Sequence, residues 1–365
     1  MNNIQTANKY VPDYLVTPGE VLEDYLGYAG ITQAALADRT GLSKKTINEI
    51  VKAKSAITAE TALKFERTLG RPAHFWSNLE RQYQEDKVRL ADKAQLEKDM
   101  QWLDMFPINT MAKYGWIEKH KEKVLQLDAL LRFFAIASPQ RWEIIWDREL
   151  QAVFRKKESS LKDTAIISAW LREGEIEAQQ QGCEPFDKQK FRNSLAEIRS
   201  LTAIEESKVF VPKLELICAS AGIAVVFVRA LPKLGIYGAT RRLNDKYIMQ
   251  LSLYGKSNDQ LWFTFFHEAC HIIKHSHREL YIEGHGQEDE KENEADAFAQ
   301  DMLIPPKELS DFLASAYKPT IPQIKRFATR IGIAPGIVVG RLQHDKIIPM
   351  SWGNDLKARY KWVEG

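Results

Sequence analysis

The stretch FTFFHEACHIIKH, residues 263–275, constrains the fold of this 365-residue chain more than any other segment. Residues four apart share one face of a helix, so His267 and His271 can present both rings to a single metal ion, with Glu268 beside them. Zinc binds imidazole and carboxylate donors, and a catalytic site uses three protein ligands and one open position. Only about 0.01 HExxH matches arise by chance in a chain of this length. The segment therefore predicts a helix with a zinc site; the alternative is a helix whose polar residues bind no metal.

A third ligand is available in the segment KENEADAFAQDMLIP, residues 291–305. Glu292 and Asp296 lie four apart and share a helix face, so one can bind the metal while the other orients a ligating histidine. Glu294 is a rival ligand in the same segment. The spacing alone leaves this choice open.

Three more histidines, His275, His277 and His285, lie close to the motif in the sequence. One of them could stabilise an oxyanion or bind a second metal ion, but such residues more often lie on a solvated loop. Cys270 points about 100° away from His271 around the helix, so we expect it to pack against the core. The three cysteines of the chain are far apart, which predicts free thiols rather than disulfides.

The residues before the motif change from a helical pattern to a strand pattern. Residues 88–206 place apolar residues three or four apart, which is typical of helices. VPKLELICASAG then predicts a helix that ends at Gly222, and IAVVFVR and KYIMQLSL predict strands. We therefore expect a mostly α protein with a small β-sheet (α+β). A helical middle region at 88–206 would precede a metal-binding domain at 207–317.

The N-terminal part contains QAALADRTGLSKKTINEIV, which has the pattern of a helix-turn-helix. Thr32 can cap the first helix, Gly41 can make the turn, and Ser43 can cap the second helix, KKTINEIVKAK. Further helices before and after this pair complete a five-helix domain, which we expect at 15–87 after an N-terminal arm at 1–14.

The second helix of such a motif enters the major groove of DNA with its N-terminal residues facing bases. Lysine can pair with phosphate or guanine, and asparagine can make a two-point contact with adenine. Residues 32–54 contain five basic against two acidic residues, which favours a nucleic-acid partner. The alternative is a helix-turn-helix kept only for contacts with proteins. The expected DNA-binding residues are Gln33, Ser43, Lys44, Lys45, Thr46, Asn48 and Lys54.

Charge is also uneven in the C-terminal half of the chain. Residues 278–296 hold eight acidic against two basic residues, whereas residues 325–361 hold eight basic against two acidic ones. We expect a basic helical tail at 318–365 that either contacts DNA, a partner or the acidic segment, or is a solvated face. The sequence has no recognisable secretory or membrane-spanning segment, so we expect a cytoplasmic protein without a membrane partner.

HEACHIIKH followed by ENEADAFAQDMLIP resembles the ImmA/IrrE family of zinc metallopeptidases, whose pattern is HExxH with a downstream ExxA(D/N)xFA helix. The similarity covers about residues 209–313 and includes GIYGATRRLN. It implies a zincin-like domain with Zn²⁺ as cofactor and Glu268 as catalytic base. The ligands that it implies are His267, His271 and Glu292, which leaves Asp296 to orient a ligating histidine. Because the family cuts repressors, the resemblance implies hydrolysis of a peptide bond in a regulator or partner protein.

Residues 17–83, including TAETALKFERTLG and FWSNLE, resemble antitoxins of the HigA type, a Cro/C1-type helix-turn-helix family. This resemblance implies a homodimer that binds operator DNA and represses its own toxin–antitoxin or mobile-element operon. Together the two resemblances predict an antitoxin-type transcription regulator with a zinc peptidase domain, whose protein partner is a cognate toxin or a target regulator. The alternative is a non-hydrolytic antitoxin whose zinc domain only binds a toxin or senses a signal.

Overall fold

A computed structural model describes residues 15–147, 150, 160–275, 280–283, 290–315 and 318–362. The arm predicted at 1–14 and the histidines His277 and His285 lie outside these ranges. The chain divides into two compact units, unit 1 (Met1–Met100) and unit 2 (Gln101–Gly365). Among the described residues, no helix is both long enough and apolar enough to cross a membrane.

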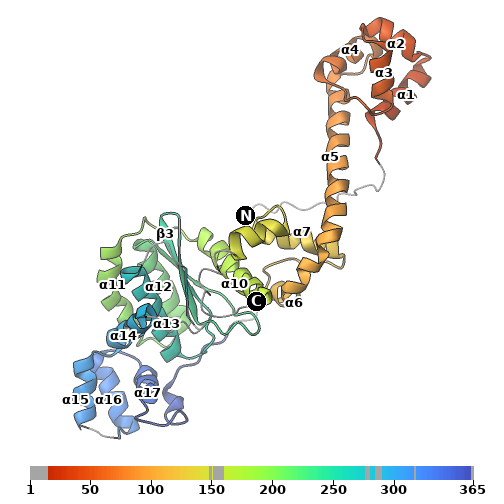
Figure 1. Ribbon diagram of the computed structural model, residues 1–365. Coiled ribbons are helices and arrows are strands. Elements are labelled where there is room, and N and C mark those ends of the chain that lie inside the picture. Colours follow the sequence, from red (N-terminus) through yellow and green to blue (C-terminus); the bar gives the residue numbers. More distant parts are fainter. Residues whose placement is uncertain are drawn as a thin grey trace. The chain divides into compact units, whose positions relative to one another are not determined.

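Unit 1 is helical throughout its described part (Figure 1). Its helices are α1 (Pro18–Ala29), α2 (Gln33–Thr40), α3 (Lys44–Val51), α4 (Ala59–Leu69) and α5 (Ala73–Asp99). Each of the first four begins after a hydroxyl side chain that accepts a hydrogen bond from a backbone N–H; these caps are Thr17, Thr58 and the predicted Thr32 and Ser43. The last helix continues past the domain end expected at residue 87, so the sequence analysis placed the break too early within this helix.

The core of unit 1 fixes α3 against its neighbours. Ile47 and Ile50 are buried with Trp76 in one hydrophobic cluster. Gly19 of α1 lies so close to α3 that a Cβ there would stand 2.2 Å from the carbonyl oxygen of Val51. This close approach requires a residue without a side chain. α3 ends at Val51, whereas the sequence analysis extended this helix to the end of KKTINEIVKAK. The lysines that follow Val51 therefore lie in the turn after α3.

Helices make up most of unit 2, and they cover a small sheet. Those before the sheet are α6 (Ile108–Lys113), α7 (Lys123–Phe134), α8 (Pro139–Trp142), α10 (Leu161–Gln180), α11 (Lys188–Leu201) and α12 (Ser207–Ser220). A 3-10 helix, η1 (Met100–Met105), precedes them and a π-helical turn, η2 (Glu143–Asp147), follows α8. Aromatic rings from η1, α7 and α8 pack edge to face in a buried cluster; its centre is formed by Trp102, Phe106, Phe134 and Trp142.

The described residues of unit 2 form a four-stranded sheet with the order β1-β3-β2-β4. The strands are β1 (Ile223–Phe227), β2 (Gly238–Leu243), β3 (Lys246–Leu251) and β4 (Tyr281–Glu283). β1 pairs with β3 in parallel, and β2 pairs with β3 and with β4 in antiparallel fashion. The mostly α fold with a small sheet is the fold class that the sequence predicted.

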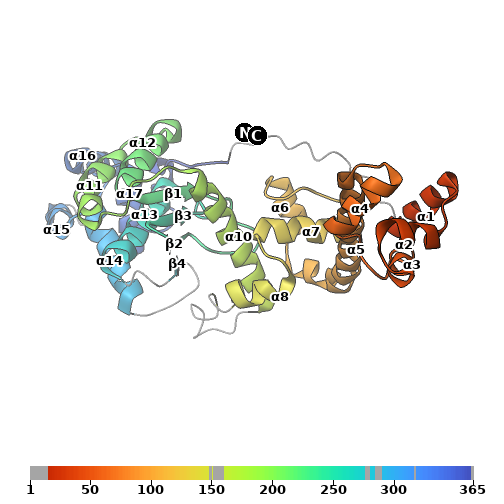
Figure 2. The same ribbon diagram turned by 90° about the horizontal axis from the view of Figure 1, so that it is seen from above.

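The two faces of the sheet are covered by different helices, as Figure 2 shows for α10 and α13 (Asn258–Lys274). Met249 and Leu251 of β3 belong to the main core, together with Phe265 and Phe266 of α13. Gln250 faces the opposite side, where its amide donates to the backbone carbonyl of Trp170 in α10. Because α13 lies in the centre of this core, both its position and its rotation about its axis are fixed by packing.

The helices after the sheet pack into the same core. They are α14 (Glu290–Leu303), α15 (Pro306–Ser315), α16 (Ile321–Ile331), α17 (Pro335–His344) and the 3-10 helix η3 (Asn354–Leu356). Phe327 and Val338 are buried in the hydrophobic cluster that contains residues of α13. Arg359 forms an isolated β-bridge with Ser257, the residue directly before α13. The segment expected as a separate tail from residue 318 is therefore continuous with the core that contains α13.

Candidate metal centre and DNA-binding helix

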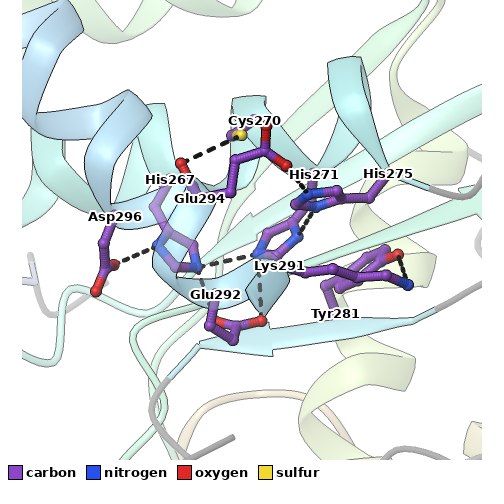
Figure 3. Close-up of polar contacts among 9 residues, drawn as sticks. All are labelled: His267, Cys270, His271, His275, Tyr281, Lys291, Glu292, Glu294 and Asp296. Atoms are coloured by element: carbon purple, nitrogen blue, oxygen red, sulfur yellow. Dashed lines mark hydrogen bonds and ion pairs between the residues drawn. The ribbon is translucent and has the colours of Figure 1, made fainter. Parts of the chain in front are cut away.

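The two histidines of the HExxH motif lie on one face of α13 and point to the same place. Each is only 2% exposed, and their Nε2 atoms are 3.0 Å apart (Figure 3). α14 packs along α13 and brings a carboxylate to both rings. Glu292 Oε2 lies 3.1 Å from His267 Nε2, and Glu292 Oε1 lies 3.4 Å from His271 Nε2.

These three residues have the chemistry and spacing of a metal site. Their ligand atoms all lie within 4.8 Å of one another, and they are the only such group of three or more among the described residues. In tetrahedral zinc sites, ligands about 2.0–2.1 Å from the metal are roughly 3.3 Å from each other. The separations of 3.0–3.4 Å between the donor atoms fit this geometry. Two imidazoles and a carboxylate also match the donors that catalytic zinc prefers.

Hydrogen bonds on the far side of each ring orient the ligands. Asp296 Oδ1 lies 2.9 Å from His267 Nδ1, which donates to it, so Nε2 is the nitrogen that would bind a metal once its own proton has left. Behind His271, the Nδ1 atoms of His271 and His275 are 2.8 Å apart, and His275 Nε2 lies 3.0 Å from Glu294 Oε2. If His275 donates to Glu294, its Nδ1 accepts from His271, and the second ligand also has Nε2 free.

Glu294 is placed differently from Glu292, although both carboxylates are on α14. Its side chain pairs with His275 and with Lys274 Nζ, which is 2.8 Å away, and it is half exposed. These two hydrogen bonds lower the pKa of Glu294, with the bond from Lys274 as the larger cause. Glu294 therefore holds His275, which lies behind His271. It is not one of the three residues whose donor atoms converge.

Glu268 is fully buried beside the ligand pair, and the Thr240 hydroxyl is close enough to its carboxylate to act on its pKa as a hydrogen-bond donor. Burial raises its pKa to about 8, against the opposing effect of His267. The backbone of β2 passes very close to this side chain, because a Cβ at Gly238 would stand 2.8 Å from Glu268 Oε1. Gly238 thus leaves the room that the carboxylate occupies.

The electrostatics of the site favour one positive charge among the ligands. Burial lowers the pKa of His267, but hydrogen bonds with Asp296 and Glu292 outweigh it and raise the pKa to about 11. Burial and the charge of His267 together lower the pKa of His271 to about 2. Two buried rings at this distance are not both positively charged, and the carboxylates around them stabilise a single cation.

Two further side chains close the site around His271. The ring of Tyr281 from β4 stacks on the His271 ring with centroids 4.2 Å apart (Figure 3). The Nζ atom of Lys291 in turn lies 3.3 Å from the Tyr281 hydroxyl.

Cys270 points away from the ligands and is buried, with its Sγ 3.9 Å from the Glu294 carbonyl oxygen. Burial raises the pKa of the Cys270 thiol to about 12, which suits the packing role predicted for it.

Sequence analysis missed two residues of this site. His275 was expected on a solvated loop, but it is 9% exposed and hydrogen-bonded to a ligand. The sequence did hold a signal for it, because His275 lies four residues after His271 and so continues the same helix face. Tyr281 had no such signal, since strand pairing over a long stretch of chain brings it to α13.

The predicted DNA-binding residues lie on α3 and at the ends of its neighbours. Lys44, Lys45 and Asn48 are exposed on the face of α3 opposite its buried isoleucines. Ser43 Oγ accepts from the Thr46 backbone N–H at 3.0 Å, so it caps the helix from an exposed position. Of the remaining candidates, Gln33 is half-buried in the first turn of α2, Thr46 is half-buried on α3, and Lys54 is exposed in the turn after α3.

Two family models match the chain. A helix-turn-helix model matches residues 29–76, and the IrrE N-terminal-like domain of peptidase family M78 matches residues 218–343. The second match covers the metal centre, and it extends across the boundary expected at residue 317 to include α16 and most of α17.

Individual relatives match the N-terminal part. Virulence-associated protein I of Dichelobacter nodosus is 36% identical over 100 residues, which are 27% of this chain and 85% of that protein. The antitoxin HigA of Pseudomonas aeruginosa, solved with the higBA promoter, is 32% identical and covers 23% of this chain and 94% of its own, with a TM-score of 0.22. An addiction module antidote protein of the HigA family from Coxiella burnetii is 27% identical and covers 23% of this chain and 91% of its own, also with a TM-score of 0.22.

These matches agree with both resemblances seen in the sequence. The helix-turn-helix model covers α2, α3 and α4, and the IrrE-like match covers the α13 and α14 pair that holds the metal ligands. The chain therefore belongs to the helix-turn-helix proteins and carries an IrrE-like, peptidase-family domain after its helix-turn-helix unit.

Proposed function

We propose that this protein is an antitoxin-type repressor whose second unit is a zinc-dependent endopeptidase. The observation that carries the proposal is the convergence of His267, His271 and Glu292 within 4.8 Å, with the buried carboxylate of Glu268 beside them. A purely structural metal site does not need a second, fully buried carboxylate beside its ligands, because burying a charge is costly.

The residues present fit a catalytic zinc site, and His267, His271 and Glu292 would hold the ion. When bound there, zinc would acidify a water molecule and polarise the scissile carbonyl. With three protein ligands, a fourth position stays open for water or substrate. Asp296 and His275 keep both imidazole rings oriented toward the ion through their Nδ1 atoms.

Glu268 is the general base of the proposed reaction. Its carboxylate accepts a proton from the attacking water and passes that proton to the leaving nitrogen of the peptide. The glycine at 238 lets β2 approach without displacing the carboxylate.

The helix-turn-helix would direct the proposed regulator to a specific DNA site. The exposed residues of α3, with those at the ends of α2 and α3, would contact operator DNA, and the capped, closely packed helix holds them in place. We propose that a homodimer binds its own operator and represses its operon, and that the peptidase acts on a regulator or a cognate toxin. The alternative is an antitoxin of the same kind whose zinc domain binds a toxin or senses a signal without hydrolysis.

The test compares zinc-loaded wild type with Glu268→Gln, which keeps the size of the side chain and removes the base. Each protein is incubated with the product of the neighbouring gene and with DNA from upstream of its own gene, and is analysed by intact mass. We expect fragments from wild type only, with equal zinc content and equal DNA binding in both proteins. Absence of fragments from both, with DNA binding intact, would favour the non-hydrolytic alternative.

A further inference from the structure

A cavity of about 530 Å³ lies in unit 2 next to the metal centre. It is bounded by the N-terminal half of α13, the C-terminal half of α14, and α17. Its lining is largely apolar, and the residues that form this part are Tyr237, Phe263, Leu303, Ile304, Ile337 and Met350. A cavity of this size and character is typical of a binding site for an organic group.

Three residues that line the cavity are neighbours of the metal centre. Phe263, one turn before His267 on α13, lines it, and the two rings are 6.3 Å apart. Thr264 lines it as well, and its Cγ2, like the Glu268 carboxylate, borders Gly238. On α14, the lining residue Gln300 lies one turn beyond Asp296, which is bonded to a ligand. A chain lying across the metal centre would therefore reach the cavity within one or two residues.

Polar atoms without partners stand in the wall of the cavity. Arg341 uses Nε to bind Asp345 at 2.7 Å, while its Nη1 is buried with no hydrogen-bond partner among the described residues. Asp259 is 9% exposed and uses Oδ2 to bind Lys357 at 2.6 Å, while its Oδ1 is likewise without a partner. Buried groups of this kind normally have partners, so Arg341 can take an acceptor and Asp259 a donor from a bound molecule.

We propose that this cavity binds a large apolar side chain of the substrate, next to the scissile bond, and that Arg341 binds an acidic residue close to it in the peptide. The inference rests on the proposed peptidase function and names its substrate class. The apolar floor matches leucine, methionine or phenylalanine, and exposed Lys346 at the rim adds to the attraction for a carboxylate. A backbone N–H of the same peptide is the donor that Asp259 Oδ1 would accept.

The test measures binding and cleavage separately. Binding uses zinc-loaded Glu268→Gln, in which turnover is blocked, and fluorescent decapeptides that contain Leu-Asp, Ala-Asp or Leu-Lys at their centre. Each additional variant is made in this background. Gln300→Trp fills the cavity from a half-buried position on α14, and Arg341→Gln removes the charge that would recognise the acid. Asp301→Trp places the same bulk at the neighbouring exposed position and is the matched control.

We expect the Leu-Asp peptide to bind at least ~10-fold more tightly than the Ala-Asp peptide, because one pocket discriminates by this order for missing methylenes. Gln300→Trp should abolish that preference and Asp301→Trp should retain it, with equal zinc content in both. Arg341→Gln should remove the preference for the Leu-Asp peptide over the Leu-Lys peptide. It should leave the preference for Leu-Asp over Ala-Asp unchanged. Equal binding of the Leu-Asp and Ala-Asp peptides, or a preference that survives Gln300→Trp, would overturn the inference. Cleavage by the wild type is read separately, so a chain that binds selectively without cutting would refute the proposed hydrolysis and not the pocket.

Discussion

Helices α3 and α13 both present candidate functional residues, but they do so in opposite environments. On α3 the candidate residues are exposed, and Lys45 has only a loose ion pair with Glu49 at 3.8 Å. Such a pair contributes little on a surface. On α13 the ligands are buried, and each ring is held by a hydrogen bond at 2.8–2.9 Å. The fold thus fixes only the backbone of α3, whereas on α13 it fixes the side chains themselves.

This difference has a consequence for substitutions. Removing an exposed residue of α3 affects a ligand that binds from outside and leaves the unit intact. Removing a buried residue of α13 leaves its partners without hydrogen bonds, so the effect reaches every group in the network. We therefore expect larger and more cooperative effects at the metal centre than at the DNA-binding helix.

The largest effect is expected for His267→Ala. This change removes a ligand and leaves Glu292 and Asp296 without their common partner. Zinc affinity should fall by more than the roughly 100-fold that loss of a residue behind a ligand can cost. Metal analysis after dialysis should then find no stoichiometric zinc, while DNA binding is unchanged. A variant that retains one zinc per chain would refute the site.

A smaller effect distinguishes the two glutamates of α14. Glu292→Gln removes a ligand charge, whereas Glu294→Gln only weakens the support behind His275. We expect the loss of zinc affinity to be greater for Glu292→Gln, and about 10-fold or more for Glu294→Gln. Competition with a chromophoric chelator measures both. The reverse order would make Glu294 the ligand.

Local patterns in the sequence predicted much of both regions. The caps Thr32 and Ser43 and the helix from residue 258 follow from short-range signals, since a cap and an i,i+4 pair each involve only neighbouring residues. The strands β1 and β3 were predicted because they are rich in apolar and β-branched residues.

The missed features depend on contacts between distant parts of the chain. β2 contains GATRRL, whose arginines and glycine do not indicate a strand, and it forms because β3 and β4 pair with it on both sides. β4 is only three residues long, so it has no periodicity to detect. Likewise, nothing near residue 318 indicates that α17 packs against α13, and the boundary expected there followed the extent of the family resemblance and the change in charge.

At the DNA-binding helix, Lys45→Ala combined with Asn48→Ala should have a moderate effect. A two-point contact of asparagine with adenine contributes about 1–3 kcal/mol of discrimination, and a lysine on phosphate adds a salt-dependent term. Operator affinity, measured by fluorescence anisotropy, should fall about 10- to 100-fold. Zinc content should not change, because both residues lie in unit 1. Unchanged affinity would refute the assignment of α3 as the recognition helix.

The smallest effect separates a structural role from a contact with DNA at Ser43. Ser43→Ala removes the cap of α3 and Thr32→Ala removes that of α2, so each should cost unit 1 about 1 kcal/mol of unfolding free energy. Thermal unfolding followed by circular dichroism should show similar losses. A unit that remains folded does not lose DNA affinity through stability alone, so only a residue that touches DNA should weaken binding. We expect operator affinity to fall a few-fold below that of the wild type for Ser43→Ala and to stay unchanged for Thr32→Ala. Equal affinities would mean that Ser43 is a cap and nothing more, and that the DNA-contacting surface begins at Lys44.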